Sequence, residues 1–217
     1  MVASKLQPVP EQTRKGVVCP WPVPEQDAPL VEALRSGHPG APGVLVDRYG
    51  RYVERLVVRV VGLTPEVPDL LHEVFTRALE RVHEIKQPEL LKAWLGSLAI
   101  FTARAWLRNR RFRRTWLRFL PPDEVPDLVA PVPDLDVHDA LRRVYRVLDR
   151  LPVDERIAFS LRFMDGMGLK ETAELCGVSP ATIKRRLGRA QARFLAEASR
   201  DPLLCERIER GERWRSR

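Results

Sequence analysis

The stretch Leu169–Phe194, LKETAELCGVSPATIKRRLGRAQARF, has the spacing of two helices joined by a tight turn. Ala173 is small where the two helices would touch, and Gly177 can adopt the positive φ that such a turn requires. Ser179 is a good N-cap and Pro180 suits the first helical position, so the second helix should begin there. The stretch therefore predicts a helix-turn-helix.

The second of these helices has two distinct faces. Four apolar residues share one sector of the helical wheel, which we expect to be buried: Ile183, Leu187, Ala190 and Phe194. On the opposite side, small residues would let the helix approach base edges, and basic residues beside them would meet phosphates. The residues expected to contact DNA are Ser179, Ala181, Thr182, Lys184, Arg185, Arg186 and Arg189. Arg185 is the best candidate for reading a base; the alternative is a helical hairpin with a solvated basic face.

Charge is unevenly distributed along the chain. The 37 Lys and Arg against 29 Asp and Glu give a formal net charge of +8, which favours a polyanionic partner. Residues 90–122 contain no acid and include the arginine-rich stretch RAWLRNRRFRRTWLRFL (104–120). Residues 123–139, in contrast, hold six acids and neither Lys nor Arg. The arginine-rich stretch predicts contacts with a nucleic-acid backbone, and a plain basic helix is the alternative.

Hydrophobic periodicity predicts an all-α fold, because every convincing apolar pattern repeats with the helical period. We expect two small helical domains joined by an acidic, Pro-rich linker, the C-terminal domain containing the helix-turn-helix. The predicted division is a Pro-rich arm (1–29), a first helical domain (30–120), the linker (121–137), a helix-turn-helix domain (138–198) and a basic tail (199–217).

Three helix boundaries and one buried face can be predicted in more detail. Gly62 should end one helix, and Thr64 or Asp69 should begin the next. A long helix should open near Glu89 and place Trp94, Leu95, Leu98, Phe101 and Ala105 on one side. A further helix is expected over 154–164.

Several classes of protein are disfavoured by the sequence. Its three cysteines, Cys19, Cys176 and Cys205, have neither disulfide-framework nor zinc-site spacing, and its four histidines have no ligand spacing. There is no glycine-rich phosphate loop, so we expect neither an enzyme nor a cofactor or metal. No apolar run is long enough to span a bilayer and no signal peptide is evident, so we expect a cytoplasmic protein without membrane insertion.

The chain resembles the extracytoplasmic-function group of bacterial sigma factors of the sigma-70 family. Three segments carry the resemblance: DLLHEVFTRALE (69–80), WLGSLA (94–99) and LPVDERIAFSLRFMDGMGLKETAELCGVSPATIKRRLGRA (151–190). It implies that the first domain docks on the β′ clamp helices of core RNA polymerase and helps open the minus-10 element. The second domain would bind the minus-35 element of promoter DNA and touch the β flap. An anti-sigma factor is a further candidate partner.

Carried over residue by residue, the resemblance implies two further sets of contacts. The polymerase-docking residues would be Asp69, Leu70, Glu73, Val74 and Phe75. The alternative is an ordinary amphipathic helix in which the three apolar members are core. The minus-10 region would be contacted by Lys86, Gln87, Arg108, Arg110, Arg111, Arg113 and Arg114.

Two positions depart from the family's usual pattern in the helix after the tryptophan. Phe101 stands where an Asn is usual, and Ala105 where an Asp is usual. Minus-10 melting or its sequence preference is therefore expected to differ. The competing interpretation of the whole chain is a helix-turn-helix regulator that binds DNA without acting as a polymerase subunit.

Overall fold

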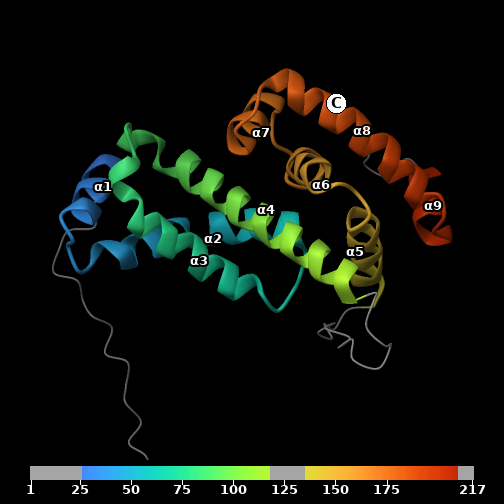
Figure 1. Cartoon of the computed structure of the whole chain (residues 1–217), viewed down its shortest axis with the longest axis horizontal. Helices are drawn as coiled ribbons and strands as arrows, with labels where there is room; N and C mark the ends of the chain where they lie inside the picture. The colour runs from blue at the N-terminus through green and yellow to red at the C-terminus, as the bar shows by residue number, and fades with distance from the viewer. Residues whose placement is uncertain (1–25, 118–134, 210–217) are drawn as a thin grey trace, which may run out of the picture.

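The computed structural model describes residues 26–117 and 135–209, and their side chains except at 113–117, 135–138 and 206–209. Over these residues the fold is all-α without a strand, as predicted (Figure 1). The helices are α1 (Asp27–Arg35), α2 (Ala41–Val61), α3 (Val67–Glu80), α4 (Leu91–Leu117), α5 (Leu135–Leu148), α6 (Val153–Phe159), α7 (Leu169–Cys176), α8 (Pro180–Ala198) and α9 (Pro202–Glu209). Two 3₁₀ turns, Val82–Glu84 and Pro88–Leu90, join α3 to α4, and a π-helical turn, Ser160–Met164, follows α6.

The first domain is built on α2, α3 and α4, with α1 packed on α2. Gly62 has a φ of 92° and ends α2, as predicted. The next helix begins at Val67 and not at Thr64 or Asp69. Pro68 lies in the first turn of α3, where a missing N–H breaks no helical hydrogen bond, and this allows the helix to start ahead of it.

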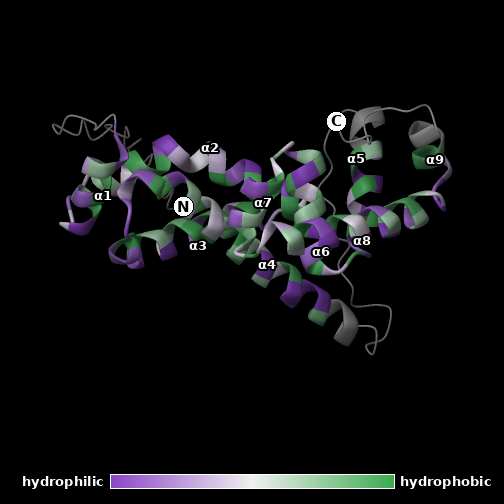
Figure 2. Cartoon of the chain, turned by 90° about the horizontal axis from the view of Figure 1, so that it is seen from above, coloured by the Kyte–Doolittle hydropathy of each residue, from purple (hydrophilic) through white to green (hydrophobic). Residues whose placement is uncertain are grey.

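The long helix α4 has 27 residues and is about 40 Å long. It begins at Leu91, two residues after the predicted Glu89. The expectation that Phe101 lies on the apolar side was wrong: its side chain is 53% exposed, and the Arg77 guanidinium carbon lies 5.4 Å from its ring centroid. The reason is helical geometry, because Phe101 lies 60° around the helix from Leu98 and so falls at the rim of the buried face. Towards its C-terminus α4 becomes largely hydrophilic (Figure 2).

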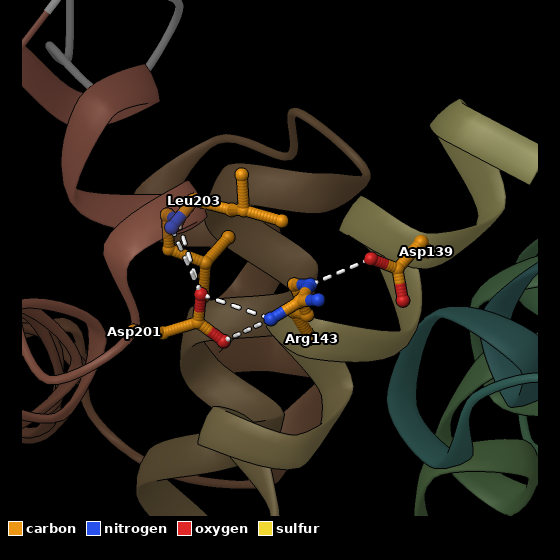
Figure 3. Close-up of polar contacts among 5 residues, drawn as sticks. Asp139, Arg143, Asp201 and Leu203 are labelled. Carbon is orange, nitrogen blue, oxygen red and sulfur yellow. Dashed lines mark hydrogen bonds and ion pairs between the residues drawn. The ribbon is translucent and has the colours of Figure 1, made fainter.

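The second domain is built on α5, α6, α7, α8 and α9. Helix α5 begins at Leu135, inside the predicted linker, and α9 forms within the predicted tail. Arg143 of α5 connects these two helices: its Nε lies 2.7 Å from the Asp139 carboxylate, and its Nη1 lies 3.0 Å from that of Asp201 (Figure 3). Asp201 also accepts the backbone N–H of Leu203 at 3.1 Å, at the start of α9.

The predicted helix over 154–164 is divided into α6 and the π-helical turn. In this turn the N–H of Asp165 donates to the carbonyl of Ser160 at 3.0 Å. Phe163, within the turn, packs against both hydrophobic clusters of the protein. One cluster joins the two domains, and the other is formed by α5, α6, α8 and α9. The ring of Phe163 lies 4.8 Å from that of Phe159 in the second cluster.

The two domains pack directly against each other. Helices α6 and α7 lie on the side of α4 away from α3 (Figure 1), and α2 contacts both α4 and the π-helical turn after α6. Leu161 and Leu175 of the second domain belong to the same buried cluster as Leu95 of the first. At Gly96 a Cβ atom would come within 2.6 Å of Leu175 and of the Tyr52 hydroxyl, so α4 and α7 meet where α4 has no side chain.

Arg156 of α6 is buried against the end of α2. Its Nε and Nη2 donate to the carbonyls of Val60 and Val61 at 2.8 and 2.9 Å, and it also pairs with Asp149. The Tyr145 hydroxyl donates to the carbonyl of Val58 at 2.9 Å. The last carbonyls of a helix have no partner within the helix and carry partial negative charge, so a guanidinium satisfies them well. The second domain therefore caps a helix of the first.

Replacement of the buried guanidinium should destabilise the protein strongly. We expect Arg156→Met to lower the free energy of unfolding by about 3 kcal/mol, because the α2 carbonyls and Asp149 would lose a buried charged donor. Chemical denaturation measures this. Arg150→Met is the control, since Arg150 is 60% exposed and pairs with Glu197 on the surface, and it should lose less than about 1 kcal/mol. Equal losses for the two variants would contradict the assigned role of Arg156.

Candidate nucleic-acid interface

The helix-turn-helix has the predicted local geometry. Gly177 adopts the left-handed conformation with a φ of 66°, and the N–H of Val178 returns to the carbonyl of Ala173 at 3.0 Å. Ser179 is the N-cap of α8, and its Oγ accepts the N–H of Thr182 at 3.2 Å. Pro180 occupies the first turn. The residues chosen from the sequence for backbone reasons thus have the backbone roles expected of them.

Helix α8 buries the predicted apolar residues and exposes a small and basic face. The buried residues are Ile183, Leu187, Ala190 and Phe194. The exposed residues include Ala181, Lys184, Arg185, Gly188 and Arg189, whereas Thr182 is half-buried. Within the described part of the chain, Arg185 makes a weak contact of 3.5 Å with the Thr182 hydroxyl, and its guanidinium is available at the surface. The small residues of this face would let the helix backbone approach the base edges, and its basic residues supply positive charge. Direct contact with a DNA groove requires both.

Three arginines of α8 pair with two acids at the start of α6. Arg186 is half-buried, with Nη2 3.4 Å from a carboxylate oxygen of Asp154. Arg189 and Arg193 pair with the buried carboxylate of Glu155 at 3.4 and 3.0 Å. Among the predicted DNA contacts, Arg186 therefore points towards Asp154 and not towards solvent. The Nε of Arg189 pairs with Glu155, but the Arg189 side chain remains 63% exposed.

The loop predicted to contact the minus-10 element lies at a cavity of about 560 Å³. Lys86 and Gln87 are exposed and line it together with Trp94. Helix α7 also lines this cavity, with Glu171 and Glu174. A helix of the second domain thus forms part of the same cavity as the loop of the first.

The predicted DNA-contacting arginines of α4 face the second domain where their side chains are described. Arg108 is 63% exposed, and its Nη2 lies 3.9 Å from Asp154. Arg110 stacks on Trp106, with its guanidinium carbon 5.0 Å from the ring centroid, and Arg111 is exposed. Arg113 and Arg114 lie in α4 but outside the residues whose side chains the structure describes.

The predicted polymerase-docking residues of α3 separate into two groups. Leu70, Val74 and Phe75 are 4, 0 and 9% exposed and belong to the core, so their expected role as surface contacts is corrected to the core alternative. The correction has a simple cause, since all three lie on the apolar side of an amphipathic helix. Asp69 is exposed, and Glu73 is half-buried and ion-paired with Arg77.

Sequence reasoning missed the residues that join the two domains at this interface. Arg104 of α4 lies 3.0 Å from Asp154 through its Nε, and its Nη2 contacts the carbonyl of Cys176 at 3.4 Å. Burial raises the pKa of the Cys176 thiol to about 11, while the nearby Arg104 and Arg186 act in the opposite direction. No spacing signal in the sequence indicates these contacts, because they join residues 50 and 72 positions apart.

Metal binding and membrane insertion have no structural support in the described ranges. In residues 26–112 and 139–205, whose side chains the structure describes, no group of three or more His, Cys, Asp or Glu side chains is placed to hold a metal ion. None of the helices that the structure describes is both long and apolar enough to cross a membrane.

Comparisons with known proteins agree with this architecture. The family described as Sigma-70 region 2 matches residues 45–113, and the family described as Sigma-70, region 4 matches residues 141–193. The ECF RNA polymerase sigma-E factor of Haemophilus influenzae is 26% identical over 186 residues, which cover 82% of this chain and 97% of the relative. The ECF RNA polymerase sigma-E factor of Escherichia coli K12 is 28% identical over 180 residues, which cover 76% of this chain and 90% of the relative.

The fold is also that of a solved structure, CnrH in complex with the cytosolic domain of CnrY. That structure matches with a TM-score of 0.54 and 24% identity, over 81% of this chain and 98% of the other. Region 2 falls within the first domain and region 4, which includes the helix-turn-helix, within the second. The chain therefore belongs to the extracytoplasmic-function group of the sigma-70 family, the sigma factors of bacterial RNA polymerase.

Proposed function

We propose that this sigma factor binds core RNA polymerase and reads the minus-35 element of its promoters with the exposed face of α8. The observation that carries the proposal is the position of Arg185, exposed at the centre of a face whose other members include Ala181 and Gly188. Small neighbours let the helix backbone approach base edges, and a guanidinium can contact a guanine in bidentate fashion. Lys184 is the second candidate for a base contact.

The minus-10 element would be contacted by the first domain. Lys86 and Gln87 at the cavity, and the arginines of α4, supply the contacts that we propose. Phe101 and Arg108 lie two turns apart on one exposed face of α4, so an aromatic ring and a cation are presented together. Such a pair suits single-stranded DNA, because bases stack on aromatic rings while cations meet phosphates.

Docking on the polymerase would use the surface acids of α3 and not its apolar residues. Asp69 is exposed and Glu73 is half-buried, so both reach the surface that we propose for the β′ clamp helices. The second domain would touch the β flap. The sigma-E relatives carry RNA polymerase in their names, which supports this assignment for the present chain.

The regulator alternative is less well supported. A helix-turn-helix regulator requires only the second domain. This chain also matches Sigma-70 region 2, and that match precedes the region 4 match in the sequence, as it does in a sigma factor. Sigma factors are not enzymes, and we propose no catalytic activity for this chain. Association with the polymerase would place it in the cytoplasm. CnrH is described bound to another protein, and an anti-sigma factor remains a prediction for this chain.

Reconstitution with core polymerase tests the proposed function. We expect promoter-dependent transcripts from genomic DNA fragments when the full chain is added to core enzyme, and none from core enzyme alone. A chain that fails to bind core enzyme at any concentration, or that protects a palindromic site without polymerase, would instead favour the regulator.

Base reading by Arg185 can be separated from backbone binding. We expect Arg185→Ala to lose about 1–3 kcal/mol of binding free energy at one promoter position and to relax preference there. Arg189→Ala, which removes a phosphate contact in our assignment, should weaken binding to all sequences alike and flatten its salt dependence. Binding measurements on a set of minus-35 variants decide between these patterns, and equal, sequence-independent losses would remove Arg185 from the base edge.

The departure at Phe101 should be visible in the minus-10 preference. We expect Phe101→Asn to change which base is favoured at one minus-10 position, because an amide reads hydrogen bonds whereas a ring only stacks. Transcription from a library randomised at the minus-10 element measures the preference. Leu203→Asn is the control, since Leu203 is 49% exposed on α9, far from α4 in the sequence, and should leave the preference unchanged. An unaltered library profile for Phe101→Asn would place Phe101 outside the DNA contact.

A further inference from the structure

The loop between α3 and α4 exposes Lys86 and Gln87 and buries two apolar residues. Val82 and Ile85 are 2% and 4% exposed, and they belong to the same buried cluster as Leu30 of α1. Helix α1 contacts both 3₁₀ turns of the loop, and Figure 1 shows it beside the segment that leads into α4. The loop that we assign to the minus-10 element is therefore packed on α1.

Arg35, the last residue of α1, binds the backbone of this loop. Its Nη2 donates to the carbonyl of Ile85, 50 positions further along the chain, and its Nη1 lies 4.0 Å from the carboxylate of Glu32. The Arg35 side chain is 28% exposed, so the contact is partly shielded from water. Because a peptide group is planar, a bond that fixes the Ile85 carbonyl also fixes the direction of the Lys86 N–H.

The end of α1 presents this guanidinium from a defined backbone. Gly37 has a φ of 72°, and the N–H groups of Gly37 and His38 return to the carbonyls of Leu34 and Ala33 at 3.2 and 2.9 Å. This is the Schellman arrangement, which ends a helix at one residue. A cation in the last turn is also favoured by the helix dipole. Arg35 thus extends from a helix end whose geometry is fixed by its own hydrogen bonds.

The hydrogen bonds that close the two turns of the loop lie on either side of Lys86. The N–H of Ile85 donates to the carbonyl of Val82 at 3.3 Å, and the N–H of Leu90 donates to that of Gln87 at 3.0 Å. Neither bond spans the junction between the turns. The guanidinium of α1 binds at this junction, where rotation of one turn against the other would redirect the exposed side chains.

We infer that Arg35 is a positioning residue for minus-10 recognition, which holds the loop so that Lys86 and Gln87 meet the DNA in one geometry. The inference rests on the proposed function, because that function assigns this loop to the minus-10 element. Helix α1 precedes the match to Sigma-70 region 2, which begins at residue 45. A helix outside the matched region thus contributes to the choice of base, through the backbone of the loop.

Transcription from a library randomised at the minus-10 element, with the full chain and core polymerase, tests the inference. Arg35→Met keeps a long side chain without a donor. We expect it to reduce the ratio between favoured and disfavoured bases by roughly 3- to 10-fold, because a lost hydrogen bond from a charged group lets the loop adopt other geometries. Arg35→Lys keeps a charged donor and should bring the ratio to within about 2-fold of wild type. The ratio does not depend on the amount of folded chain, so destabilisation alone would leave it unchanged.

Arg48→Met is the matched control. Arg48 of α2 pairs with Asp27 at 3.3 Å, at the opposite end of α1, and its side chain is 22% exposed. The variant removes one charge and one contact of α1 but leaves the bond to Ile85 in place, so the ratio should change by less than about 2-fold. Equal reductions for Arg35→Met and Arg48→Met would overturn the inference. So would a uniform loss for all bases in Arg35→Met, which would indicate a general effect of charge.

Hydrogen exchange in the free chain provides a measurement without DNA. We expect Arg35→Met to speed the exchange of backbone amides in residues 82–90, relative to those of α3, by roughly 3- to 10-fold, since the loop would open more often. Arg48→Met should leave this relative rate unchanged. Mass spectrometry of peptides from the full chain measures both segments at once. Unchanged exchange of the loop in Arg35→Met would overturn the inference.

Gln87→Ala separates failure of the inference from failure of the proposed function. This variant should change the base profile directly, because Gln87 is one of the residues proposed to contact the DNA. A changed profile for Gln87→Ala together with an unchanged one for Arg35→Met would overturn the inference and leave the proposed function standing. An unchanged profile for Gln87→Ala would remove the loop from the minus-10 contact and the inference with it, and the exchange rates would still decide whether Arg35 holds the loop.

Discussion

The burial of one guanidinium, that of Arg156, against the end of α2 constrains the rest of the structure. A buried arginine requires partners for its N–H groups, and the carbonyls of Val60 and Val61 supply two of them, from the other domain. Gly62 must end α2 at this point, because its φ of 92° turns the chain away and the Tyr145 ring lies 3.1 Å from where a Cβ atom would be. The two domains are therefore positioned by polar groups whose geometry is specific, and the apolar contacts around them follow.

Local features of the sequence predicted local features of the structure. The conformation of Gly177, the cap at Ser179 and the buried face of α8 each depend on residues within four or five positions, and all were confirmed. The predicted orientation of Phe101 was wrong. A residue at the rim of a helix face packs according to its neighbours on another helix, and the neighbour here is Arg77. Contacts between the domains were beyond prediction, since nothing in the spacing of Asp154 and Arg104 indicates that a fold will bring them together. Helix α9 was assigned to the tail, because the Arg-rich composition there hid a short amphipathic segment around Leu204, and α1 begins within the last three residues of the predicted arm.

The distribution of charge acquires a second meaning in the folded protein. The excess of Arg in α4 and α8 is typical of a DNA-binding protein. In the fold, however, several of these arginines form ion pairs with Asp154 and Glu155 at the start of α6. Ion pairs between half-exposed groups are weakened by salt, and so are contacts between arginines and phosphates. The same ionic strength that loosens DNA binding therefore also loosens the contact between the domains, and the net effect of salt on this sigma factor is the balance of the two.

Phe163 joins the two hydrophobic clusters of the protein. It lies in the π-helical turn after α6 and packs against both hydrophobic clusters, the larger of which already contains residues of both domains. Residues that share a neighbour do not contribute independently to stability, so the energies of the two clusters are coupled. Two family regions that are distinct in sequence thus share one buried cluster, and local unfolding of the helix-turn-helix would expose part of the core of the first domain.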